Sequence, residues 1–92
     1  MKGVEIHMSS LEDIKHAPRR VVGIKQVMRA METGGVQAVY LAADADAAFR
    51  TRVQEACTRY AVPLHSIACM ADLGRACGIA VDAAVAAALG AD

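Results

Sequence analysis

Helical spacing of hydrophobic side chains predicts two amphipathic helices in the middle of the chain. After Gly23, hydrophobic residues recur at positions i, i+3, i+4 and i+7, the spacing of one helix face: Ile24, Val27, Met28 and Met31. Gly34-Gly35 is expected to end this helix with a left-handed cap. A second helix follows Asp44 or Asp46, and its hydrophobic residues again share one face: Phe49, Val53, Ala56, Cys57 and Tyr60.

Two shorter helices are predicted from their end signals. Ser9 or Ser10 can cap a first helix that runs to about His16, with acidic residues in its first turn that favour the helix dipole. Pro18 ends this helix, because proline lacks the backbone N–H that a helix interior requires. A further short helix is expected over residues 70–77, where a glycine follows directly.

Short hydrophobic segments between these helices predict strands. Arg19–Val22 is expected to be a brief strand, and Val36–Ala43 a buried one that is rich in β-forming residues. Val62–Ala68 predicts another strand, since Pro63 lies at its beginning, where a missing donor is tolerated. Ala83–Leu89 has the alanine content of a helix, but the alternation of strands and helices would also fit a last strand. This alternation predicts a layered α/β fold.

The composition supports one packed domain over residues 1–92. The hydrophobic fraction of 55% argues against disorder, and its large alanine share predicts closely packed helices and strands. No apolar run reaches the roughly 18 to 20 residues of a membrane-spanning helix, and the first residues lack the apolar stretch of a signal peptide. We therefore expect a cytoplasmic protein without a membrane partner.

The formal net charge is zero, but the charges are unevenly distributed along the chain. Residues 1–29 carry six basic and three acidic side chains, and the remaining residues carry the opposite excess. A compact basic face on a neutral protein can still bind phosphate groups. We expect weak binding to arbitrary RNA, because non-specific affinity grows with each phosphate contact. Specificity would then come from shape and base contacts.

The cysteines and histidines predict neither a metal site nor a cofactor. Cys57, Cys69 and Cys77 form no C-x-x-C pair, and the first and last of them lie among alanines, where a cysteine usually acts as a small buried hydrophobe. The three histidines have no ligand-like partner at helical spacing: His7, His16 and His65.

The Asp44-Ala45-Asp46 segment contains two carboxylates that could suggest acid/base chemistry. At a junction between a strand and a helix, a carboxylate is more often a helix cap, and we favour this role for Asp44. Asp46 could also accept a hydrogen bond from a base edge. No histidine, serine or cysteine stands near them as a nucleophile and base, so we do not expect an enzyme.

The segment Gly23-Ile24-Lys25-Gln26 opens a predicted helix and is the first candidate binding site. A helix start offers unpaired backbone N–H groups and a positive dipole end, which suit phosphates and the electronegative edges of bases. Lys25 can donate to guanine or phosphate, Gln26 can donate and accept, and Arg29 follows one turn later. An ordinary solvated helix face is the competing interpretation.

A second candidate is the apolar loop that follows the short helix over residues 70–77: Gly78, Ile79, Ala80 and Val81. Apolar loop residues can pack on an unstacked RNA base, because the faces of bases are themselves apolar. The competing interpretation is that Ile79 and Val81 turn into the core.

Taken together, these segments resemble the L7Ae/L30e family of ribosomal and kink-turn-binding proteins. The resemblance runs from about Val21 to Leu89 and rests on four segments in a family-like order: Gly23–Arg29, Leu41–Asp46, Val62–Leu64 and Leu73–Ile79. It implies a three-layer α-β-α sandwich around a mixed four-stranded sheet. In that family the alanine-rich tail is a strand, which favours a strand over residues 83–89.

The resemblance also implies a way of binding RNA. The helix start at Gly23 would enter the widened groove of a kinked RNA helix beside tandem sheared G·A pairs. Family members usually carry Asn-Glu where this chain has Lys25-Gln26. The Lys-Gln pair is common in the bacterial branch of the family, so this difference points to that branch. Arg29 would contact phosphate, and Asp46 would lie near the extruded base.

The RNA-binding residues expected from the resemblance come from the helix start, the strand end and the apolar loop: Gly23, Ile24, Lys25, Gln26, Arg29, Asp46, Gly78, Ile79, Ala80 and Val81. The expected partner is structured kink-turn RNA, in ribosomal RNA or a riboswitch, together with ribosomal proteins. The alternative is a non-catalytic protein-interaction or assembly module on the same fold.

Overall fold

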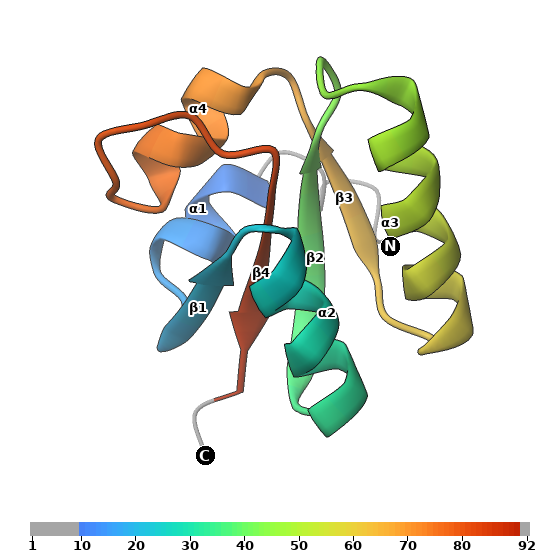
Figure 1. Ribbon diagram of the computed structural model, residues 1–92. Helices are drawn as coiled ribbons and strands as arrows, with labels where there is room; N and C mark the ends of the chain where they lie inside the picture. The colour runs from blue at the N-terminus through green and yellow to red at the C-terminus, as the bar shows by residue number, and fades with distance from the viewer. Residues whose placement is uncertain (1–9, 91–92) are drawn as a thin grey trace, which may run out of the picture.

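The computed structural model describes residues 10–90, and in them a mixed four-stranded sheet lies between two pairs of helices (Figure 1). The elements follow one another in the order α1 (Ser10–Lys15), β1 (Arg19–Val22), α2 (Ile24–Thr33), β2 (Val36–Ala42), α3 (Ala47–Arg59), β3 (Leu64–Ile67), α4 (Met70–Ala76) and β4 (Val85–Leu89). The α/β class and the three-layer sandwich expected from the sequence are confirmed.

The alanine-rich tail forms a central strand of the sheet. The strand order is β1-β4-β2-β3, with β4 antiparallel to both of its neighbours and β2 parallel to β3. Ala87, for example, pairs with Val21 on one side and Val39 on the other. Two neighbouring strands thus supply hydrogen-bond partners for this segment, which explains why tertiary pairing overrides its helix propensity.

Two hydrophobic cores lie on opposite faces of the sheet. One core joins α1 and α4 to the sheet, and its largest buried residues are Ile14, Tyr40 and Leu73. The other core joins α2 and α3 to the opposite face, with Val27, Val39, Val53 and Val85 fully buried. Successive alanines of β4 alternate between the two cores, because side chains of a strand point to opposite faces in turn.

The predicted burial of two cysteines is confirmed, one in each core. Cys57 packs between α3 and the sheet, and Cys77 packs beside α4. Burial raises the pKa of both thiols, because removal from water disfavours the charged thiolate. Arg20 partly opposes this effect on the pKa of Cys77.

The ends of several elements differ from the sequence expectation by one or two residues. β3 begins at Leu64, after Pro63, and β4 begins at Val85 instead of Ala83. Gly34 ends α2 with φ 95° and ψ 170°, so the cap has a positive φ but lies outside the left-handed helical region. The extended ψ leads the chain directly toward β2. Ser9, one of two proposed caps of α1, lies outside the described residues.

Tyr60 was expected on the buried face of α3, and this expectation is wrong. It is the C-terminal cap residue of that helix, and 36% of its surface is exposed. The helix ends at Arg59, beyond the residues that pack on the sheet, so the tyrosine ring is left at the surface. Among the described residues, no helix is long and apolar enough to cross a membrane.

Candidate nucleic-acid interface

The three predicted binding segments lie at one edge of the sheet (Figure 1). β1 and β2 each pair with β4 in antiparallel orientation, and β3 is parallel to β2. The carboxyl ends of β1, β2 and β3 therefore lie at the same end of the sheet as the start of β4. The Gly23 N–H donates to the Val85 carbonyl at 3.0 Å, and the Ala42 N–H donates to the Ala84 carbonyl at 2.9 Å. These bonds hold the start of α2, the end of β2 and the loop before β4 together.

The start of α2 presents unsatisfied backbone donors. The first helical hydrogen bond is from the Val27 N–H to the Gly23 carbonyl at 2.9 Å, and no side chain of the described residues caps the helix. Within residues 10–90, the N–H groups of residues 24–26 have no acceptor, and no acidic side chain lies in the first turn. Gly23 has φ 99°, a value that other residues rarely adopt. This helix end is therefore open to an electronegative group.

The side chains beside this helix start form a polar ridge. Lys25, Gln26 and Arg29 are exposed, whereas Val27 and Met31 on the opposite side are buried. In the described part of the chain, the ion pairs lie elsewhere, between Glu12 and its neighbours and between Asp72 and Arg75. The two cations of the ridge lie one helical turn apart and repel each other. Among the described residues, the Glu32 carboxylate borders the same surface hollow but forms an ion pair with neither. A bound anion would relieve this repulsion.

The two carboxylates after β2 cap two different helices. Asp46 Oδ2 accepts from the N–H groups of Ala48 at 3.0 Å and Phe49 at 3.4 Å, so Asp46 caps α3. Asp44 Oδ1 accepts from the Met70 N–H at 2.9 Å and serves α4 instead. The expectation that Asp44 caps the helix that follows it is therefore wrong. The reason is the parallel pairing of β2 with β3, which places the end of β2 beside the start of α4.

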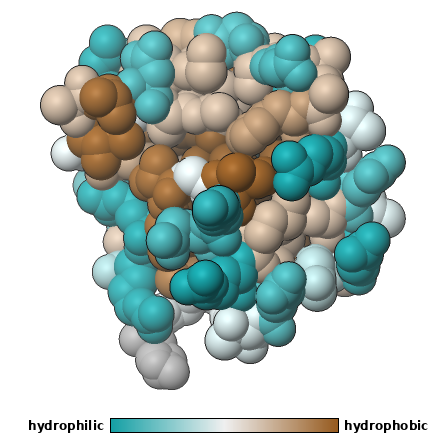
Figure 2. Space-filling model, in the orientation of Figure 1, coloured by the Kyte–Doolittle hydropathy of each residue, from teal (hydrophilic) through white to brown (hydrophobic). Residues whose placement is uncertain are grey.

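The loop between α4 and β4 exposes its apolar side chains. Ile79 is 37% exposed and Val81 is 67% exposed, so the interpretation in which they turn into the core is wrong. The Ile79 N–H donates to the Gly74 carbonyl at 3.2 Å, and the Ala83 N–H donates to the Met70 carbonyl at 3.1 Å. Figure 2 shows hydrophobic surface over this loop and around the turn from β1 into α2.

Gly74 leaves room for this loop to pack closely on α4, a role that sequence reasoning missed. A Cβ atom built at Gly74 would lie 2.2 Å from the Val81 carbonyl oxygen and 3.1 Å from the Asp82 Cα. The backbone of the loop therefore passes directly over the helix, in a space that any side chain would fill. A glycine inside a short helix was the available signal, because it costs helix stability unless close packing requires it.

Comparison with known proteins establishes the family. The sequence model of the ribosomal protein L7Ae/L30e/S12e/Gadd45 family matches residues 7–92. The chain belongs to this family. It is 43% identical over 70 residues to an RNA-binding protein of Caldanaerobacter subterraneus subsp. tengcongensis, over 76% of this chain and 85% of that one. It is 38% identical over 80 residues to the RNA-binding protein YbxF of Geobacillus stearothermophilus, over 87% of this chain and 98% of that one.

Solved structures with the same fold include a named RNA-binding protein. The Giardia lamblia 15.5kD RNA binding protein superimposes with a TM-score of 0.85 at 27% identity, over 100% of this chain and 80% of that chain. A Bacillus halodurans protein of unknown function gives a TM-score of 0.77 at 27% identity, over 92% of this chain and 85% of that chain. The L7Ae-like fold expected from the sequence is thus confirmed.

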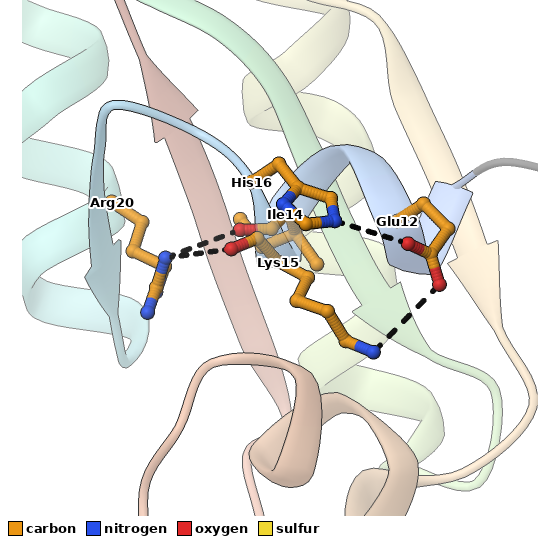
Figure 3. A network of polar contacts seen from close by, with 5 residues as sticks. All are labelled: Glu12, Ile14, Lys15, His16 and Arg20. Atoms are coloured by element: carbon orange, nitrogen blue, oxygen red, sulfur yellow. Dashed lines mark hydrogen bonds and ion pairs between the residues drawn. The ribbon is translucent and has the colours of Figure 1, made fainter.

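Arg20 of this L7Ae-family chain is a structural residue, although the sequence counted it in the basic face. Its Nε donates to the Cys77 carbonyl at 3.2 Å. Its Nη1 donates to the carbonyls of Ile14 at 3.4 Å and Lys15 at 3.2 Å. Figure 3 shows this side chain pointing from β1 toward the end of α1. One cation thus satisfies carbonyls at the carboxyl ends of α1 and α4 and fixes the point where the Gly78 loop begins.

The basic face is correspondingly smaller than the sequence suggested. Lys15 pairs with Glu12 at 3.7 Å, on α1 and on the other side of the sheet from α2. Lys2 lies outside the described residues. The cations of the amino-terminal third that remain beside the candidate interface are Arg19, Lys25 and Arg29.

The described histidines are not placed with metal ligands. In residues 10–90, no group of three His, Cys, Asp or Glu side chains is arranged to hold a metal ion. His65 stacks on Tyr40, with ring centroids 5.1 Å apart, and His16 contacts Glu12 at 3.2 Å. His7 lies outside the described residues.

Proposed function

We propose that this protein binds structured RNA at the edge of the sheet where α2 begins. The observation that carries the proposal is the open start of α2, with exposed Lys25 and Gln26, beside an exposed apolar loop. Its membership of the L7Ae family and the names of its relatives as RNA-binding proteins support the same function. The proposed surface comprises Gly23, Ile24, Lys25, Gln26, Arg29, Asp46, Gly78, Ile79, Ala80 and Val81.

Each part of this surface suits a different part of an RNA. The free N–H groups at the start of α2, with Lys25 and Gln26, can donate to the electronegative edges of bases, and Arg29 can contact phosphate. Ile79 and Val81 can pack on a base that has left its stack, because an apolar side chain and a base face both lose water there. This combination favours an RNA with an open groove and an extruded base over a regular duplex.

The RNA that fits these requirements best is a kink-turn with tandem sheared G·A pairs. Such an RNA exchanges between extended and bent forms, and a protein that binds only the bent form shifts the equilibrium by its differential affinity. No chemical step is needed. The loop of Gly78 is tied to α4 at both ends, so the protein offers a preformed surface. We infer a cytoplasmic role on ribosomal RNA or a riboswitch, together with ribosomal proteins.

A double variant, Lys25→Ala with Gln26→Ala, tests the site directly. Each lost base contact should weaken binding to a hairpin with tandem G·A pairs by about 1 to 3 kcal/mol, or roughly 5- to 150-fold. Arg59→Ala on α3 is the matched control, because it removes one exposed cation away from the proposed surface. If the double variant binds this RNA as tightly as the wild type, the site assignment is wrong.

An assembly module is the second candidate function, and the exposed apolar Val81 favours it. Such a module would bind a protein through the loop and would not distinguish a kink-turn from a plain duplex. A gel-shift titration at low salt separates the two functions, because only the RNA-binding protein should prefer the hairpin with G·A pairs.

A further inference from the structure

Most of the residues that line a groove between α2 and the edge strand β1 are not among the proposed contact residues. Its polar walls are formed by Arg19 of β1 and by Gln26, Arg29 and Thr33 of α2, and its floor includes Val21. Among the described residues, two arginines and no acidic side chain line the groove. The described lining of the groove therefore carries net positive charge.

The alternation of β1 explains why Arg19 reaches this groove. Successive side chains of a strand point to opposite faces, so Arg19 and Val21 lie on the side of α2, whereas Arg20 and Val22 lie on the side of α1 and α4. Adjacent arginines thus have separate roles. Arg20 is committed to backbone carbonyls, but the Arg19 guanidinium has no hydrogen-bond or ion-pair partner among the described residues.

The wall of the groove formed by α2 carries a second guanidinium without an ion pair among the described residues, that of Arg29. The Arg29 side chain has no acidic partner in residues 10–90, and its backbone carbonyl accepts a hydrogen bond from Thr33 Oγ1 at 2.9 Å. Two guanidinium groups that share a groove repel each other, and a phosphate placed there would neutralise both. Guanidinium donors also match the oxygens of a phosphate in geometry.

Gln26 connects this groove to the open start of α2, since it lines the groove and belongs to the first turn of the helix. A strand that contacts the helix start can therefore continue along the groove. We propose that the groove between β1 and α2 binds the phosphate backbone of the same RNA, with Arg19 as a contact that the family resemblance does not supply. This inference rests on the proposed function and extends its footprint along the RNA.

The test is a salt titration of Arg19→Gln with a synthetic hairpin that carries tandem G·A pairs within a long stem. One lost phosphate contact should reduce the slope of log affinity against log salt by about 1 and weaken binding. The preference for this hairpin over a plain duplex should stay unchanged, because phosphate contacts carry no sequence information. Arg59→Gln, which removes an equal charge elsewhere, should leave the slope unchanged.

The outcomes separate this inference from the proposed function. If Arg19→Gln matches the wild type in affinity and slope while Lys25→Ala with Gln26→Ala loses binding, only the groove is excluded. If the wild type shows no preference for the G·A hairpin, both are overturned. Circular dichroism confirms that each variant is folded, which is expected because Arg19 is exposed.

Discussion

Gly74→Ala separates helix propensity from tertiary packing in one substitution. Gly74 lies within α4, where alanine should stabilise the helix by about 1 kcal/mol over glycine. The structure predicts the opposite sign. The added Cβ would lie 2.2 Å from the Val81 carbonyl oxygen, whereas ordinary contacts begin near 3.4 Å. The loop backbone would have to move by more than about 1 Å to make room.

The expected size of the effect follows from these two opposing contributions. Overpacking in a tight site costs about 1 to 3 kcal/mol. We expect a cost near the upper end of this range for Gly74→Ala, because the new Cβ would meet backbone atoms and not the flexible end of a side chain. After subtraction of the helix gain of about 1 kcal/mol, we expect a net loss of about 2 kcal/mol in the free energy of unfolding. Urea denaturation followed by circular dichroism measures this difference.

Gly90→Ala is the matched control for this prediction. A Cβ at Gly90 would lie 3.7 Å from Gln37 Nε2 and 3.8 Å from the Gly35 carbonyl oxygen, both ordinary contacts. This variant should change the free energy of unfolding by less than about 1 kcal/mol. If Gly74→Ala were as stable as the wild type or more stable, the close approach of the loop to α4 would be refuted.

Three further predictions concern the core and its surroundings. Burial, with a smaller contribution from Asp13, raises the pKa of Tyr40 from 10.0 to about 12. The stability that the neutral phenol provides is therefore complete below pH 10 and is lost as the pH rises to about 12. Denaturation at pH 9 to 12 should show a loss of up to about 3 kcal/mol that Tyr40→Phe abolishes; an equal loss in that variant would contradict the assignment. Of the three thiols, only the half-buried Cys69 should react quickly with a thiol reagent in the native protein, and Cys69→Ser should remove the fast phase. A fast phase that persists would show that a core thiol is accessible. Arg20→Gln should lower the free energy of unfolding by about 1 to 2 kcal/mol through lost carbonyl contacts, and an unchanged urea midpoint would exclude this role.

Local spacing accounts for most of the fold. Hydrophobic residues at helical intervals identified α2 and α3, because a helix face is fixed by residues that are close in sequence. The tail over residues 83–89 needed the family resemblance, since alanine favours a helix and only pairing with β1 and β2 makes it a strand. Sequence patterns cannot supply that pairing by themselves.

Long-range contacts explain what the sequence missed at the candidate site. Arg20 contacts Cys77 from 57 positions away, and Asp44 caps a helix that begins 26 positions later. Local patterns identified Asp44 as a capping residue but not the helix that it caps. Two adjacent arginines in a short strand must face opposite sides of the sheet, and this is the signal that could have separated Arg20 from the basic face.

We propose that this L7Ae-family protein recognises kink-turn RNA through the edge of the sheet where α2 begins. The most direct test compares wild-type affinity for two hairpins at the same salt concentration, one with tandem G·A pairs and an extruded nucleotide, the other with Watson–Crick pairs throughout. One base contact is worth about 1 to 3 kcal/mol, so we predict a preference of about tenfold or more for the first hairpin. Equal affinity for the two hairpins would contradict recognition of kink-turn RNA by this protein.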